Sequence, residues 1–133
     1  MNAEQILKAM RTQRELGVPM GGTPEAPRRM TLLRPTELEI QRDLLKLLPG
    51  ADGKPTAQLL VDPDTVHRYV VGWDGYTTAD LLGPAGGSDA APFAPELVRE
   101  WLANNPADIH VLVEALLTAV ATHINSKAEA AKN

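Results

Sequence analysis

The clearest alternation of apolar and polar positions lies in the last third of the sequence. Asn105 can cap a helix, Pro106 suits the first helical position, and Asp108 places a negative charge in the first turn. Apolar residues then recur every three or four positions, which is the period of an amphipathic helix. The spacing predicts a long helix from Pro106 whose apolar stripe is Ile109, Leu112, Val113, Leu116, Leu117, Val120 and Ile124.

Shorter apolar stripes predict further helices. A Thr36-x-x-Glu39 capping box opens a helix that Pro49-Gly50 ends, and Pro95 opens another. A third stripe has the spacing i, i+3, i+4, i+7 and predicts a helix over residues 66–73, with apolar positions Val66, Tyr69, Val70 and Trp73.

The N-terminal segment, residues 2–16, has only a thin apolar stripe before Gly17. An isolated helix of this length is marginal in water. The segment is therefore interpreted either as a mobile arm or as an arm that becomes ordered when it docks on a partner.

Glycine and proline divide the rest of the chain. They predict a linker over residues 17–28 and a loop over 77–94, while residues 28–34 are compatible with a short extended strand. We therefore expect a mainly α-helical fold of four to five helices and at most one short strand pair. The expected organisation is an N-terminal helix and flexible linker over 1–28, a helical core domain over 29–125, and a polar tail over 126–133.

Charge and composition narrow the class of protein. The chain has 133 residues, lacks cysteine and has a net charge of −4. Residues 1–50 carry +2 and residues 51–133 carry −6, which argues against a dedicated nucleic-acid-binding module. The longest apolar run, residues 111–121, is interrupted by Glu114 and Thr118, so no membrane partner is expected.

Residues for catalysis or metal binding are not grouped along the sequence. His67, His110 and His123 do not occur at the i, i+3 or i+4 spacing that presents a metal pair on a helix. Ser88 and Ser126 are the only serines, and both lie outside a Gly-x-Ser-x-Gly turn. We therefore predict no catalytic, cofactor-binding or metal-binding residue, and a function in binding.

The aromatic residues form a distinctive order in the second half of the chain. Gly72-Trp73-Asp74-Gly75 is followed by a loop, by Pro92-Phe93-Ala94-Pro95-Glu96, by Trp101 and by the long last helix. This order resembles the small tail-assembly chaperones of long-tailed bacteriophages (siphoviruses), and the resemblance covers roughly the C-terminal half.

The resemblance implies a partner and a place of action. Such chaperones bind the long tape-measure protein, keep it soluble while tail-tube subunits assemble, and are not retained in the mature virion. The resemblance therefore implies a protein of the host cytoplasm whose partner is the tape-measure protein, with the tail-tube protein as a second candidate partner. The alternatives are a structural tail or head-completion protein and a small transcriptional regulator. The wide stripe of the last helix also predicts self-association. The candidate partner-binding residues are Trp73, Phe93, Trp101, Leu116 and Val120.

Overall fold

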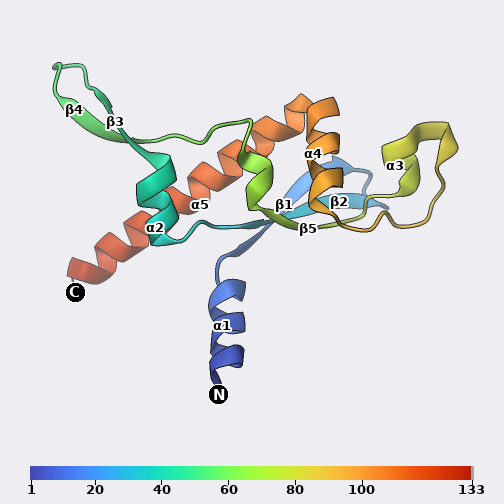
Figure 1. Cartoon of the computed structure of the whole chain (residues 1–133), viewed down its shortest axis with the longest axis horizontal. Coiled ribbons are helices and arrows are strands. Elements are labelled where there is room, and N and C mark those ends of the chain that lie inside the picture. The colour runs from blue at the N-terminus through green and yellow to red at the C-terminus, as the bar shows by residue number, and fades with distance from the viewer. Residues whose placement is uncertain (133) are drawn as a thin grey trace.

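The computed structural model describes residues 1–132 and has an α/β fold (Figure 1). Within these residues it contains five α-helices, five strands and three short 3-10 or π-helical segments. In chain order they are α1 (Ala3–Thr12), β1 (Glu15–Gly22), β2 (Pro27–Leu33), α2 (Glu37–Glu39), η1 (Ile40–Leu44), β3 (Leu45–Pro49), β4 (Pro55–Leu59), η2 (Val66–Tyr69), β5 (Val70–Asp74), α3 (Thr78–Leu82), η3 (Gly83–Ala85), α4 (Pro95–Asn104) and α5 (Pro106–Lys132).

A three-stranded antiparallel sheet forms the centre of the molecule, with strand order β1-β2-β5. Met30 of the central strand pairs with Val18 on one side and Trp73 on the other. Because side chains alternate between the two faces of a strand, Val18, Met30 and Trp73 lie on the same face of the sheet, which is apolar. Helices α4 and α5 cover that face, and the fully buried residues of the resulting core include Met30, Leu32, Val66, Val98, Leu112 and Leu116.

Helix α5 joins this main core to a second, smaller one. Leu112 and Leu116 are completely buried in the main core, whereas Val120, one turn further on, is buried against Ile40 and Leu44. The helix is therefore shared by both apolar clusters.

Two elements project from the body. The β3–β4 hairpin extends at one end, and Leu47 near its tip is 75% exposed. Helix α1 extends in another direction, and all of its residues are exposed (Figure 1). Two-stranded hairpins and short isolated helices are marginally stable in water, so both projections are suited to making contacts with other molecules.

Helix α5 is also long and apolar enough to cross a membrane when judged by length and composition alone. Part of its apolar surface is used within the chain, because Leu112, Leu116 and Val120 are fully buried in the two cores. The expectation that the protein lacks a membrane partner stays a prediction.

The prediction of a mainly α-helical fold with at most one short strand pair is wrong, because the described residues form two sheets. Residues 66–73, predicted as one helix, are divided between η2 and β5. Valine, tyrosine and tryptophan favour strands. The hydrogen bonds that β5 forms with β2 therefore outweigh the helical spacing of the four apolar residues in this segment.

Two other strands replace predicted loop or helix. Residues 17–28 were expected to be a linker, but β1 runs from Glu15 to Gly22, and its proline is tolerated because β1 is an edge strand. The predicted Thr36 capping box is present. The helix after it ends at Leu44, however, because the next residues pair with β4 across the turn at 50–54.

The predicted starts of two helices are confirmed, whereas two predicted irregular segments contain helix. Helices begin at Pro95 and Pro106, as their sequence signals indicate. The segment 77–94, predicted as a loop, contains the short helix α3, because Thr77 and Asp80 form a capping box at its start. Helix α5 continues to Lys132 through most of the segment predicted as a polar tail, whose last residue, Asn133, lies outside the described residues.

Candidate binding groove

An open groove lies between β1 and α5. Its volume is about 730 Å³, and its lining is mainly apolar. Strand β1 and the segment before it form one wall, and a face of α5 forms the other. The lining residues are Gln13, Arg14, Glu15, Leu16, Gly17, Val18, Pro19, Arg34, Val111, Glu114, Ala115, Thr118, Ala119, Thr122 and His123.

The groove exists because β1 is at the edge of the sheet and the facing side chains of α5 are small. Ala115, Thr118, Ala119 and Thr122 lie about one turn apart along the helix, so its backbone is covered by little side-chain volume at this point. On the other wall, Pro19 lacks an amide hydrogen and therefore limits pairing with an added strand. The site is better suited to a helix than to a strand.

The two ends of the groove differ in charge. At one end Arg14 Nη1 donates to the Arg34 carbonyl oxygen at 2.8 Å, and the Arg34 amide donates to the Arg14 carbonyl at 2.7 Å. Burial, followed by the nearby Arg14 charge, lowers the pKa of Arg34. Glu15 also lines this end, which is basic on balance because Arg14 and Arg34 are both there. On α5, Glu114 lies one to two turns before Thr118 and Thr122, so it places a negative charge toward the opposite end.

The basic end is fixed to α5 by a small ion-pair network. Glu37 Oε1 lies 2.8 Å from Lys127 Nζ and 2.8 Å from His123 Nε2. These two hydrogen bonds, that of Lys127 first, lower the pKa of Glu37. The network holds the start of α2, which follows Arg34, beside the C-terminal part of α5.

The aromatic residues of the sequence motif form a separate cluster. Trp73 stacks on Tyr76 with ring centroids 4.5 Å apart, and Phe93 contacts Trp73 edge-on at 6.1 Å. Tyr76 also contacts Trp101 edge-on at 5.2 Å, and the Arg28 guanidinium lies over Tyr76 and Trp101. The order of aromatic residues along the chain thus encodes packing between β5 and α4.

Hydrogen bonds fix both indoles in this cluster. Trp73 Nε1 donates to the Ala91 carbonyl oxygen at 3.1 Å, and Trp101 Nε1 donates to the Asp108 carboxylate at 2.9 Å. The second bond connects α4 to the first turn of α5. Both indole N–H groups are therefore satisfied within the chain.

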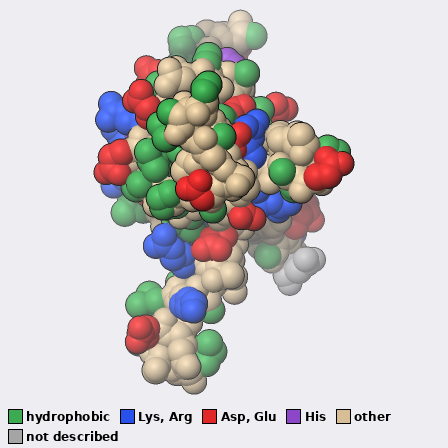
Figure 2. All heavy atoms as spheres, turned by 90° about the vertical axis from the view of Figure 1, so that its right-hand side faces the viewer, with side chains coloured by type: hydrophobic (Ala, Val, Ile, Leu, Met, Phe, Trp, Pro, Cys, Tyr) green, Lys and Arg blue, Asp and Glu red, His purple; other side chains and the backbone are tan. Residues whose placement is uncertain are grey.

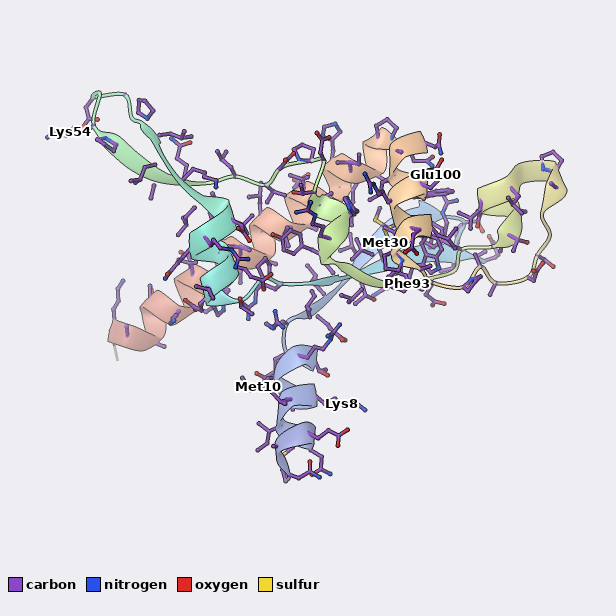
Figure 3. All side chains as sticks on the ribbon, viewed as in Figure 1. Lys8, Met10, Met30, Lys54, Phe93 and Glu100 are labelled. Carbon is purple, nitrogen blue, oxygen red and sulfur yellow. The ribbon has the colours of Figure 1, made fainter. Side chains whose placement is uncertain are left out.

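The structure distributes the five candidate partner-binding residues between core and surface. Leu116 and Val120 are completely buried, Trp101 is 9% exposed and Trp73 is half-buried. Phe93, which is labelled in Figure 3, is the most accessible of the five at 36%. Trp73, Phe93 and Trp101 come together in the aromatic cluster, while Leu116 and Val120 lie in the main and second cores.

The sequence does not predict the groove, because the groove depends on the pairing of β1, most of which lies in the predicted linker over 17–28. A usable signal was present in α5, where small residues at 115, 118, 119 and 122 follow helical spacing beside the apolar stripe. Their meaning becomes clear only when an edge strand lies opposite them.

The described residues do not suggest metal chemistry: within 1–132, no group of three histidine, aspartate or glutamate side chains lies close enough together to hold a metal ion. Comparison with protein-family models, with curated proteins and with solved structures found no match.

Proposed function

We propose that the protein is a tail-assembly chaperone of a long-tailed bacteriophage, which binds apolar helical segments of the tape-measure protein and keeps that protein soluble during tail-tube assembly. The observation that supports this best is the open apolar groove between β1 and α5. An amphipathic helix placed in such a groove buries its apolar face, as in other helix-in-groove complexes.

The dimensions of the groove suit a short helical segment. On α5 the groove extends from Val111 to His123, which corresponds to roughly 18 Å of helix. A client helix of about three turns has a similar length. Its apolar residues would lie against Leu16 and Ala119, and charged residues at its ends would be near Arg34 and Glu114.

The most direct test is co-expression with the tape-measure protein of the phage that encodes the chain. We expect the chain to raise the soluble fraction of the tape-measure protein and to co-purify with it. A Thr118→Arg variant should lose this effect, because Thr118 is exposed in the groove and an arginine would obstruct it.

The matched control is Asn125→Arg, which adds the same charge to an exposed position of α5 that is not among the groove residues. It should behave like the parent. If the tape-measure protein remains insoluble with the parent, the chaperone proposal is wrong. If Thr118→Arg and Asn125→Arg are equally active, the client binds elsewhere.

The proposal also concerns the fate of the chain. A chaperone is expected in the infected-cell lysate and should be missing from purified particles. Mass spectrometry of both fractions tests this, and a stoichiometric amount in particles would favour a structural tail or head-completion protein.

A further inference from the structure

We infer that the groove between β1 and α5 receives helix α1 of a second copy of the chain, so that the protein self-assembles by exchange of its N-terminal arm. The inference rests on the proposed function in one respect: the groove is the same one that is proposed to receive the client helix. In the absence of client, α1 is the occupant.

Helix α1 has an apolar face without a partner in its own chain. Ile6, Leu7 and Met10 are 46%, 65% and 57% exposed. These residues lie on one side of the helix, whereas Lys8 points to the opposite side, as Figure 3 shows for Met10 and Lys8. The space-filling view also shows apolar side chains on this projecting helix (Figure 2). Exposed apolar faces of this kind are typical of interaction sites.

The size of α1 fits the groove. Its ten residues span about 15 Å, against roughly 18 Å for the groove along α5. The capping box at Asn2 and Gln5 favours the helical form of α1 and so lowers the cost of ordering it on binding.

The connection to β1 directs α1 away from its own groove. Only Gln13 and Arg14 separate the helix from the strand. Arg14 is held by hydrogen bonds in both directions with Arg34. To enter its own groove the helix would have to reverse direction within these two residues. A second copy can supply α1 without that reversal, as in domain-swapped assemblies.

Charge determines the direction in which α1 lies. Glu4 and Arg11 flank the apolar face of α1, near its start and its end. The groove has Arg34 at one end and Glu114 at the other. Opposite charges meet when the N-terminus of α1 lies at the Arg34 end, which places Arg11 of the inserted helix beside Glu114 of the copy that provides the groove.

Sedimentation of the purified chain without client tests the assembly. We expect a concentration-dependent dimer or larger species for the parent. Leu7→Glu places a charge in the proposed contact and should raise the dissociation constant by about 30-fold or more, the change expected for a hot-spot residue. Lys8→Glu is the control, because it changes charge on the opposite face of the same helix and should assemble like the parent.

Cross-linking identifies the contact itself, and the cysteine-free sequence makes it unambiguous. In the double variant Ile6→Cys/Thr118→Cys, oxidation should give a disulfide-linked dimer, since both positions lie at the middle of their surfaces. Lys8→Cys/Thr118→Cys is the matched control and should form much less. An intramolecular cross-link, or the same low yield in both pairs, would overturn the inference.

These results separate the two proposals. Leu7→Glu should become monomeric and still solubilise the tape-measure protein, because its groove is empty and intact. If Leu7→Glu assembles like the parent, α1 exchange is wrong whatever the client experiment gives. If Leu7→Glu is monomeric but neither it nor the parent solubilises the tape measure, only the chaperone function is wrong.

Discussion

Replacement of Trp101 should destabilise the fold more than any other single change among the aromatic residues. The side chain is 9% exposed, contacts the Tyr76 ring at 5.2 Å, lies beneath the Arg28 guanidinium, and donates its indole N–H to Asp108 at 2.9 Å. Removal of a buried tryptophan typically costs ~3–5 kcal/mol of unfolding free energy. We expect the loss for Trp101→Ala to be near the upper end of this range, because it also removes the hydrogen bond that connects α4 to α5.

A conservative variant separates packing from hydrogen bonding. Trp101→Phe keeps an aromatic ring beside Tyr76 but loses the bond to Asp108, and a hydrogen bond to a charged group contributes ~1.5–3 kcal/mol. Asp108 is only half-buried and can be rehydrated, so about 1–2 kcal/mol is expected here. Asp108→Ala, made in the parent and in Trp101→Phe, completes a double-mutant cycle. We expect a coupling free energy of about 1 kcal/mol between the two positions.

The measurement is urea unfolding followed by far-ultraviolet circular dichroism, because a fluorescence signal would change with the loss of the tryptophan itself. For a chain of this size, 1 kcal/mol corresponds to about 4 °C in Tm, so a loss near 5 kcal/mol should lower the Tm of Trp101→Ala by roughly 20 °C. His110→Ala, at an exposed position of α5, is the control. If Trp101→Ala unfolds within 1 kcal/mol of the parent, the aromatic cluster does not stabilise the fold as described.

Three further changes have definite expected outcomes. Within residues 1–132 the buried Tyr76 hydroxyl lacks a hydrogen-bond partner, and burial raises its pKa. Tyr76→Phe removes this unsatisfied group and should increase the free energy of unfolding in urea by about 1 kcal/mol. A loss of stability would mean that the hydroxyl has a partner. Hydrogen bonds from Thr77, with a smaller contribution from Arg28, lower the pKa of Asp80 below its ordinary value of 3.8. The stability that ionised Asp80 provides is therefore complete above about pH 4 and is lost as the pH falls through the lowered pKa, so thermal melts between pH 5 and 2 should show a smaller acid loss for Asp80→Asn than for the parent. Leu47→Lys near the hairpin tip should leave Tm within about 1 °C, because the residue is 75% exposed, and a large drop on calorimetry would mean that the hairpin packs on the body.

The sequence predicts this molecule best where local signals determine the outcome. The capping box at Thr36 and the helix starts at Pro95 and Pro106 depend on residues within one turn, and all three are present. The strands could not be predicted in this way, because their stability depends on partners far away in sequence. Strand β5 pairs with β2 about forty residues earlier, and this pairing also determines which side of Trp73 is buried.

The candidate groove has the same origin. It requires an edge strand, which is a property of the strand order, and small residues on the facing helix, which are a property of the sequence. A linker over residues 17–28 would leave α5 without a facing wall, so its small residues indicate a groove only once β1 is paired in the sheet. The aromatic residues of the sequence motif form a connected cluster, and their role in partner binding stays a prediction.

The position of α5 in both apolar clusters affects how the molecule should open in solution. Leu112 and Leu116 anchor the first half of the helix in the larger core. The second half packs through Val120 on Ile40 and Leu44 and is joined to α2 through Glu37. Amide hydrogen exchange should therefore proceed in two steps along this one helix, since cooperative units follow the buried contacts that hold them. Amides after Val120 should exchange together with those of η1, and amides before Leu116 should exchange only when the three-stranded sheet unfolds.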